Sequence, residues 1–588
     1  MRRKHQQVTF KPYTQAQLSL PLKLGDLIAA DHLVRVVDRV IEGLDLDGLM
    51  RGYKGGGTSS YHPRMMLKVI VYAYTQRLYS SRQIAKALRE NIHFMWLSGG
   101  NQPDFRTLNR FRGTRMKVVI AEVFAEVLEY LVAGSYVKLE TYFVDGTKIE
   151  ANANRYRYVW AKNVQRQQTH LREKIATLLG QIDQVNEEEQ AEYGDDDLEE
   201  LGGHGGSDGS GDSAELAATI ARLNARLKGE PENKDLAQVV RKLERDYQPR
   251  LERYERQEAT LAGRNSYAKT DEAATYMRMK EDHRYDAQPK AGYNVQMGTE
   301  NQFVVGYSVH QQATDSPCLI PHLQQLQEQL GTLPERIVAD AGYGSEENYA
   351  YLDEAALGNY VKYPLFDRER KRSWRKQKYR VENWPYDAER DEFTCPQGQA
   401  LTRLKSVHDL TSNGYARERQ LYECAECSNC PVKAQCTRAA GNRRVIVSLA
   451  LHAYRERVRA NLLSAEGQRL RAKRAVEVES VFGRLKHNWG FRRFMLRGLE
   501  KVTLEWGLLC LAHNMAKLAT CCSPVSFFPA PNTVHQPAET HSRLCFWDSP
   551  YSHPFQCTFR RRSKPYNEMN VVWHDHERIE RDRGEPAR

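Results

Sequence analysis

The hydrophobic and polar positions change period several times along the chain, and the first stretch has a helical period. Apolar residues recur every three or four positions in LGDLIAADHLVRVVDRVI and RMMLKVIVYAYTQRLY. The run SSRQIAKALREN from Ser80 adds a serine suited to an N-cap, apolar spacing at Ile84 and Leu88, and basic residues on its other faces. We therefore predict an all-helical region over residues 1–135. Its last run is either a helix-turn-helix element or an amphipathic helix with a solvated basic face.

Further along, the pattern alternates like strands, and two of these strands carry an aspartate. In TYFVDGTKIEA, Asp145 follows a run of apolar residues, and in ERIVADAGYGS, Asp340 follows another and precedes a glycine turn. An aspartate is depleted in strands and costly to bury unpaired, so it is a turn-former, an ion-pair partner or a metal ligand. Gly146 favours a turn at the first strand, but the recurrence of the arrangement makes a turn alone a poorer explanation.

Around these aspartates the pattern predicts an α/β core with two insertions. Two strand-like runs flank Glu300-Asn301 and indicate a hairpin, and CLIPHLQQLQEQLG indicates a helix before the strand that ends at Asp340. The order strand, strand, strand, helix, strand is what an RNase H-like core requires, with its first and fourth strands adjacent at the centre. Residues 164–263 are predicted as a helical hairpin with an acidic, glycine-rich loop in the middle.

The second insertion contains five cysteines. One stands in TCPQG and four stand in YECAECSNCPVKAQCTR. A thiolate pair two residues apart can chelate one ion, and the overall spacing permits a tetrahedral zinc site. We favour Cys395, Cys427, Cys430 and Cys436 as the ligands, with Cys424 as the alternate. Reduced or redox-labile thiols without a metal are the other interpretation.

A helix with an acid and a lysine on one face is predicted over residues 475–486. Its apolar side carries Val478, Val481, Phe482 and Leu485. Glu479 and Lys486 are seven residues apart, so two helical turns put them on one face, where both could approach one phosphate group. Glu477 is the competing acid, but it lies on another side of the helix from Lys486. A surface helix with salt bridges is the alternative interpretation.

Charge and hydropathy narrow the class of protein. The 588 residues carry a formal net charge of +11, and 41% of them are hydrophobic, which suits a globular protein with a polyanionic partner such as nucleic acid. A chain of this length is expected to form about three or four domains. No apolar run is long enough to span a bilayer, and the charged start has no apolar segment behind it. We therefore expect a cytoplasmic protein without membrane contact.

Four blocks together resemble bacterial insertion-sequence DDE transposases that carry a helical N-terminal domain. The blocks are FVDGTKIEANAN, GYNVQ, IVADAGYGS and VESVFGRLKHNWGFRRFMLRGLEKV, and the resemblance spans residues 10–520. It implies an RNase H-like catalytic core in which Asp145, Asp340 and Glu479 bind two Mg²⁺ or Mn²⁺ ions. Lys486 matches the basic residue seven positions beyond the glutamate.

One position departs from the pattern of related families. Ala475 stands where some of them have an arginine four residues before the glutamate, and Arg471 or Arg474 would have to take over that contact with DNA.

The resemblance implies a transposase that binds the terminal inverted repeats of its element and a target DNA. Water would attack a phosphodiester at the end of the element and free a 3′-hydroxyl, which would then attack the target DNA. Magnesium or manganese would serve both steps, since these ions prefer hard oxygen ligands. A homodimer on paired ends in the bacterial cytoplasm, associated with the nucleoid, is expected. Basic residues expected at the DNA are Lys148, Arg82, Arg106, Arg492 and Arg493. The alternatives are an RNase H-like nuclease without strand transfer and an inactive DNA-binding relic.

This interpretation divides the chain into consecutive segments. They are a helical DNA-binding domain (1–135), the first part of the core (136–163 and 264–366), a helical insertion (164–263), a cysteine-bearing insertion (367–455), the C-terminal helices of the core (456–520) and a disordered tail (521–588).

Overall fold

The computed structural model describes residues 23–51, 53, 60–193, 212–229, 232–279, 289–411 and 413–521, without the side chains of 182–193. These residues belong to one compact unit. Most of the predicted acidic loop, and the predicted tail beyond Cys521, lie outside the described residues. In the part of the chain that is described, no helix is both long and apolar enough to cross a membrane.

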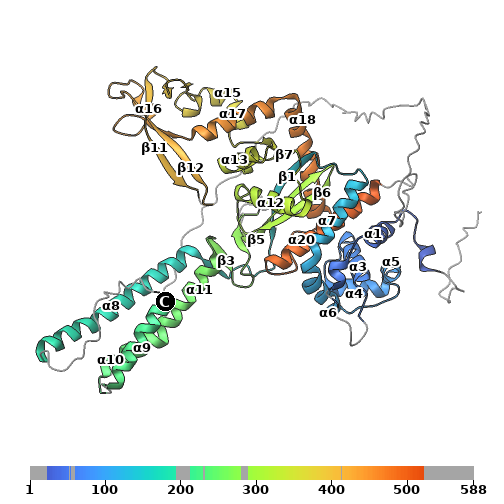
Figure 1. Ribbon diagram of the computed structural model, residues 1–588, viewed down its shortest axis with the longest axis horizontal. Coiled ribbons are helices and arrows are strands. Elements are labelled where there is room, and N and C mark those ends of the chain that lie inside the picture. Colours follow the sequence, from blue (N-terminus) through green and yellow to red (C-terminus); the bar gives the residue numbers. More distant parts are fainter. Residues whose placement is uncertain are drawn as a thin grey trace, which may run out of the picture. The chain divides into compact units, whose positions relative to one another are not determined.

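Helices alternate with turns through the described residues of the N-terminal part, as the period of its apolar residues predicts (Figure 1). They are α1 (Leu33–Glu42), α2 (Asp47–Arg51), α3 (Pro63–Thr75), α4 (Ser81–Glu90), α5 (Ile92–Leu97), α6 (Phe105–Arg110) and α7 (Lys117–Ala133), with a π-helical turn at Phe111–Met116. Ile84 and Leu88 are buried on α4, so its basic residues take the outer faces. Helix α3 is buried on nearly all sides because it packs against both α1 and the last helix of the chain, α20 (Leu499–Cys521).

A six-stranded mixed sheet is the centre of the fold. Its strands are β1 (Thr141–Glu150), β4 (Thr275–Met277), β5 (Lys290–Glu300), β6 (Phe303–His310), β7 (Arg336–Ala339) and β8 (Gly358–Val361). The order is β4-β5-β1-β7-β8, and β6 also pairs with β5. β5 runs antiparallel to both β1 and β6, whereas β1, β7 and β8 are parallel to one another. The predicted adjacency of the strands that carry Asp145 and Asp340 is therefore present.

The predicted hairpin is formed by β5 and β6. Its turn consists of Asn301 and Gln302, which both have positive φ angles (52° and 61°), as a two-residue turn between twisted strands requires. Helix α20 packs along β6 and contacts α3 and α7 (Figure 1). Asn514 of α20 makes a pair of hydrogen bonds with the backbone of Val304, each 2.8 Å long. The helix thus covers a strand whose first six residues, Phe303 to Ser308, are all buried.

Strand β1 continues past Asp145, so the expectation that it ends or turns there is wrong. β1 pairs with β7 only up to Val144 but with β5 as far as Glu150. Gly146 lies within the strand, and a Cβ atom at this position would collide with the side chains of Gln296 and Asp315. The glycine is thus explained by close packing over the strand rather than by a turn.

The described part of residues 164–263, where a two-helix hairpin is predicted, contains four α-helices. They are α8 (Ala161–Tyr193), α9 (Ser213–Gly229), α10 (Lys234–Lys242) and α11 (Gln248–Leu261), and the short strands β2 (Tyr158–Trp160) and β3 (Ser266–Ala268) pair at their base. α11 contacts both α8 and α9. The helices share a separate core that includes Leu171, Leu243 and Leu251. The helices between β1 and β5 thus bury their apolar residues among themselves rather than against the central sheet.

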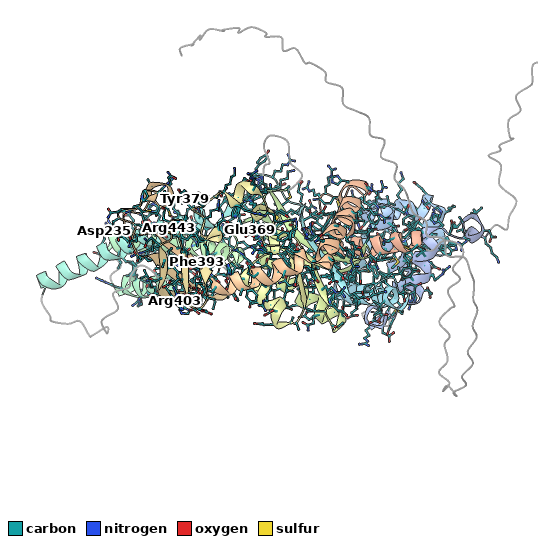
Figure 2. The ribbon with its side chains drawn as sticks, turned by 90° about the horizontal axis from the view of Figure 1, so that it is seen from above. Asp235, Glu369, Tyr379, Phe393, Arg403 and Arg443 are labelled. Carbon is teal, nitrogen blue, oxygen red and sulfur yellow. The ribbon has the colours of Figure 1, made fainter. Side chains whose placement is uncertain are left out.

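The cysteine-bearing insertion contains a five-stranded antiparallel sheet that the sequence pattern does not predict. Its strands are β9 (Tyr386–Asp387), β10 (Glu392–Thr394), β11 (Ala400–Leu410), β12 (Ala416–Cys424) and β13 (Arg444–Val447), in the order β13-β12-β11-β10-β9. Phe393, Leu401 and Tyr422 form its small core. Figure 2 shows Phe393, Arg403 and Arg443 of this region among its side chains.

The remaining helices connect these parts. They are α12 (Leu319–Leu330), α13 (Glu346–Glu354), α14 (Phe366–Glu369), α15 (Arg372–Arg375), α16 (Lys433–Cys436), α17 (Leu449–Leu463), α18 (Ala465–Arg474) and α19 (Ser480–Gly483). π-helical turns at Ala475–Glu479 and Arg484–Asn488 flank α19.

Candidate active site

The two aspartates lie side by side on neighbouring parallel strands. Val144 of β1 pairs with Ala339, the last residue of β7; Asp145 is the next residue of β1, and Asp340 directly follows β7. Neighbouring strands are about 4.8 Å apart, so this register puts both carboxylates next to each other, just beyond the point where the pairing of β1 with β7 ends. The Asp145 side chain is 13% exposed and that of Asp340 is 51% exposed. Asp340 Oδ1 also accepts a hydrogen bond of 2.5 Å from the backbone N–H of Ala341, which fixes one side of the carboxylate.

The structure brings Glu479, and not Glu477, to these aspartates. Glu479 is half exposed and faces Arg474, the residue that also contacts both aspartates. Glu477 is 3% exposed, accepts a hydrogen bond of 2.6 Å from the backbone of Gln302 and pairs with Lys473 at 3.2 Å. Glu477 therefore attaches its helix to the β5–β6 turn.

One guanidinium group joins the three acids. Arg474 Nη2 lies 3.3 Å from Asp145 Oδ1 and 3.8 Å from Asp340 Oδ2, and Arg474 Nη1 lies 3.0 Å from Glu479 Oε1. Arg474 is 15% exposed at its side chain. Three elements that are far apart in the sequence thus present their carboxylates to a single cation.

The π-helical turn explains how Arg474 and Glu479 come to face each other. They are five residues apart, which in a regular α-helix would separate them by about 140°. In a π-helical turn the backbone bonds run from i to i+5, so residues at this spacing lie on one side. From the sequence, Arg474 is predicted only as a substitute for the arginine missing at Ala475, and its position between the acids does not follow from that prediction.

The Lys486 side chain is buried against β1, where it contacts Thr147, rather than lying on an exposed helix face. It is 6% exposed, and its Nζ donates to Thr147 Oγ1 at 2.8 Å and to the backbone carbonyl of Lys148 at 3.4 Å. Thr147 is two residues beyond Asp145 and on the same face of β1, because strand side chains alternate. The second π-helical turn, which contains Lys486, directs the ammonium group at β1. Its positive charge thus lies close to the acids without being exposed to solvent.

The other basic residues predicted at this site are partly occupied by the protein itself. Arg493 donates to the backbone carbonyls of Ala151 and Ala153, at 3.3 Å and 3.2 Å, and its side chain remains 49% exposed. Arg492 Nε donates to the carbonyl of Lys486 at 3.5 Å. Arg493 therefore joins the segment after Glu479 to the residues that follow β1, whereas the Arg492 side chain bonds within its own segment.

Asp315 is an acid of this region that the sequence analysis missed. Its Oδ1 accepts hydrogen bonds from Asn294 at 2.8 Å and Gln296 at 3.3 Å, and it lies beside both Gly146 and Gly342. Burial, and then the charges of Asp145 and Asp315, raise the pKa of the Tyr343 hydroxyl. Asp315 stands in QATDSP, where neither a strand nor a helix pattern distinguishes it from an ordinary turn aspartate.

Arg82 and Arg106 lie apart from the acids, at a cavity of about 850 Å³ between the N-terminal helices and the core. Both guanidinium groups lie over the half-exposed ring of Phe105, at 5.1 Å and 5.7 Å from its centre. Asn152, which follows β1, and Met495, which follows the Glu479 segment, line the other side. The cavity therefore combines basic, aromatic and amide groups next to the ends of the elements that carry the acids.

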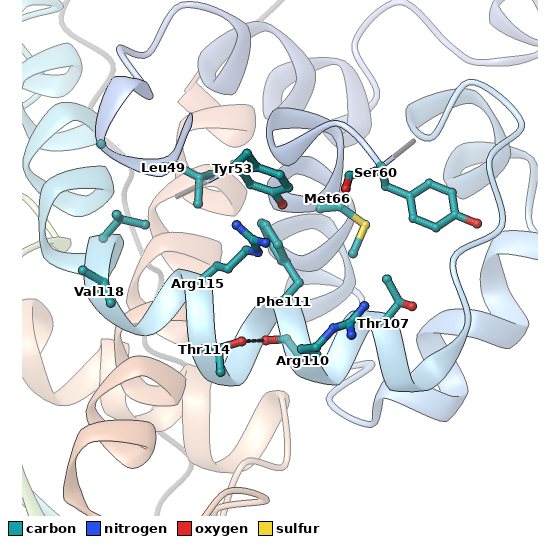
Figure 3. A pocket seen from close by; sticks show the side chains of 13 residues that line it. Leu49, Tyr53, Ser60, Met66, Thr107, Arg110, Phe111, Thr114, Arg115 and Val118 are labelled. Atoms are coloured by element: carbon teal, nitrogen blue, oxygen red, sulfur yellow. Dashed lines mark hydrogen bonds between the residues drawn. The ribbon is translucent and has the colours of Figure 1, made fainter. Parts of the chain in front are cut away.

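A neighbouring cavity of about 760 Å³ lies wholly within the N-terminal helices. Figure 3 shows Arg115 directed at Tyr53, whose ring centre is 3.7 Å from the guanidinium carbon. Arg110 lines this cavity as well as the previous one. The two hollows thus meet at α6, whose first and last residues are Phe105 and Arg110.

The five cysteines of the second insertion line one small cavity; they are Cys395, Cys424, Cys427, Cys430 and Cys436. Burial and a hydrogen bond with Cys427 raise the pKa of the Cys424 thiol to about 12. Burial also raises the pKa of Cys436. Burial therefore favours the neutral thiol at Cys424 and Cys436.

In the described residues, no three His, Cys, Asp or Glu side chains are arranged to hold one metal ion. This applies to the cysteines and to the three acids, which are gathered around Arg474 instead. The acids nevertheless suit a divalent cation in kind, because they supply hard oxygen donors and already surround a positive charge.

Two family models match parts of the chain. One, described as a transposase domain, matches residues 22–114, and the other, described as a transposase DDE domain, matches residues 394–519. The first match contains Arg82 and Arg106, and the second contains Glu479 and all five cysteines of the insertion. Asp145 and Asp340 lie outside both matches. No curated protein matches the chain.

Proposed function

Because both family matches support an insertion-sequence DDE transposase, we propose that this transposase cuts the ends of its element and joins them to target DNA. Asp145, Asp340 and Glu479 are its catalytic acids in this proposal, and Lys486 assists them. The observation that carries the assignment is the convergence of the three carboxylates on Arg474. Asp145 and Asp340 lie outside the matched residues, so their convergence with Glu479 is independent of the matches.

The strand order supports an RNase H-like catalytic core. β6, β5, β1, β7 and β8 follow one another across the sheet, with β5 antiparallel and β7 and β8 parallel to β1. The two aspartates follow the paired ends of the central strands, and the glutamate comes from a helix near the end of the chain. In this interpretation the α8–α11 helices and the β9–β13 sheet are insertions.

The acids would hold Mg²⁺ or Mn²⁺, because both ions prefer carboxylate oxygens to imidazole or thiolate ligands. Bound there, such ions activate an attacking oxygen and stabilise the leaving oxygen at a phosphodiester. Asp340, fixed by its hydrogen bond from Ala341, would keep its carboxylate oriented, and the buried Lys486 would limit repulsion around Asp145 through its position at Thr147.

DNA would be held by the basic groups on both sides of the acids. We assign phosphate contacts to Arg82 and Arg106, whose cavity lies next to the ends of the catalytic elements, and to the exposed part of Arg493. Lys148 and Arg492 complete the proposed contacts. Such contacts weaken as salt rises because DNA binding releases counterions. The terminal inverted repeats and a target would be the substrates, a homodimer would pair the two ends, and the protein would work at the nucleoid in the cytoplasm.

The experiment that tests this function uses the purified full-length chain with its terminal repeats, magnesium and a target plasmid. Joined products are expected. Nicked repeats without joined products would instead identify a nuclease that lacks strand transfer. Binding without any cut strand would identify an inactive relic.

A structural zinc ion in the cysteine insertion is a separate proposal, supported by the gathering of the cysteines at one cavity. Thiolate pairs two residues apart chelate zinc, and binding would remove the protons that the buried thiols hold. We expect one zinc ion per chain by elemental analysis, retained in Cys424→Ser and lost in Cys430→Ser. Less than half an equivalent of zinc in the wild-type chain would contradict the site. If Cys424→Ser lost the zinc and Cys395→Ser retained it, Cys424 rather than Cys395 would be the fourth ligand.

A further inference from the structure

Arg474 is the cation around which the three acids are gathered. Carboxylates that share a site repel one another, and a positive charge between them lowers that repulsion. The guanidinium balances one of three negative charges, so two remain unbalanced among these four groups. The arrangement therefore keeps an attraction for cations of higher charge.

Two of the three ion pairs of Arg474 contribute less to stability than the ion pairs of a fully buried arginine. Asp340 and Glu479 are about half exposed, and ion pairs at such positions contribute little to stability. The distance of 3.8 Å to Asp340 exceeds that of a hydrogen bond. Arg474 Nε is buried and has no hydrogen-bond partner among the described residues. A buried donor without a partner makes this position unfavourable for the side chain.

We propose that Arg474 occupies the position of the divalent ions in the metal-free protein and is displaced when they bind. It is thus a positioning residue: it keeps Asp145, Asp340 and Glu479 together before metal loading and competes with the ions for the same oxygens. The inference rests on the proposed function, since it requires these acids to be the metal ligands. In addition to that function, the Arg474 side chain acts as an internal competitor. It makes the affinity of the site for metal lower than it would be with the three acids alone.

Manganese binding to the full-length protein tests the competition. Mn²⁺ is titrated into wild type and Arg474→Met, and binding is followed by calorimetry and by the paramagnetic resonance of free Mn²⁺. Removal of a competing cation whose pairs with Asp340 and Glu479 are half exposed is expected to tighten binding by about fivefold to tenfold. In EDTA the variant should melt at a lower temperature than wild type, because its acids repel, and Mn²⁺ should raise its melting temperature more.

Two variants separate competition by charge from a general effect of mutation. Arg474→Lys keeps a positive charge and should bind Mn²⁺ with an affinity close to that of wild type. Arg469→Met removes a 74% exposed arginine from the same helix, whose acidic partner is Glu466, and should not change the affinity. Unchanged or weaker Mn²⁺ binding in Arg474→Met would overturn the inference while the acids remained metal ligands. Absence of Mn²⁺ binding in every variant, including wild type, would instead overturn the metal site and this inference with it.

Discussion

Asp340→Asn is expected to abolish both cleavage and strand joining while the protein still folds and binds its terminal repeats. Asparagine has the size of aspartate and its side-chain oxygen can still accept the hydrogen bond from Ala341. Asparagine lacks the negative charge of Asp340. That charge faces Arg474 in the structure, and in the proposed function it binds the metal ion. Loss of an outer partner of a metal ligand already costs about 10- to 100-fold, so loss of a ligand should cost at least about 100-fold in rate.

The measurement is the yield of cut and joined DNA with magnesium, beside a binding assay with the same repeats. Asp353→Asn is the matched control, because Asp353 is 51% exposed as well and pairs with an arginine, Arg457, at 3.0 Å, but lies on α13 away from the acids. It should retain full activity. An Asp340→Asn protein that still joined strands would remove Asp340 from the metal site.

The strands of the core could be predicted because local pattern determines them. β5 and β6 are strand-like runs on either side of Glu300-Asn301, which reads as a turn, so the hairpin follows from neighbouring residues alone. The parallel pairing of β1 with β7, in contrast, joins segments almost 200 residues apart. It could be predicted only because the order of elements matched a known arrangement, and the position of Asp145 within β1 rather than at its end was missed.

The helical part of the site was predicted less well because it is not a regular α-helix. The apolar residues Val478, Val481, Phe482 and Leu485 are all buried, as their spacing predicts. Two π-helical turns nevertheless change the direction of the polar residues on either side of α19. A count at 100° per residue therefore cannot foresee that Arg474 faces Glu479 or that Lys486 is directed at Thr147.

The β9–β13 sheet was missed for another physical reason. Strand β11 is mostly exposed and rich in polar residues, so it lacks the alternation that marks a half-buried strand. Leu401 is its buried residue, and cross-strand ion pairs join its polar end to β12: Arg417 and Arg419 of β12 both bind Asp409 of β11, at 2.8 Å and 2.9 Å. Pairing of this kind depends on register, which composition does not reveal.

The N-terminal helices hold the segment that follows the glutamate, which links the two matched regions. Tyr79 donates to the backbone carbonyl of Trp489 at 3.1 Å. Glu505 of α20, whose pKa is raised by burial, accepts from the backbone N–H groups of Met495 and Leu496, at 2.9 Å each. The positive charge of Arg112 opposes this increase in the pKa of Glu505 but is the smaller effect. The position of Glu479 therefore depends on residues from both ends of the chain.

The comparison of Glu479 with Glu477 separates a catalytic acid from a structural one. Glu479→Gln should lower joining at least about 100-fold but change the free energy of unfolding by no more than about 0.5 kcal/mol, because its side chain is half exposed. Glu477→Ala should do the reverse: it removes the acceptor of the partly buried Gln302 N–H and the carboxylate that pairs with Lys473. Such a loss costs about 1–3 kcal/mol.

Urea unfolding gives the stabilities, and a joining assay at equal concentrations of folded protein gives the activities. The two substitutions serve as each other's control, since they lie two residues apart on the same π-helical turn. A Glu477→Ala protein that folded normally but could not join strands, together with an active Glu479→Gln protein, would reassign the third acid. It would also require the helix to rotate when metal binds, because only Glu479 faces Arg474 in the described arrangement.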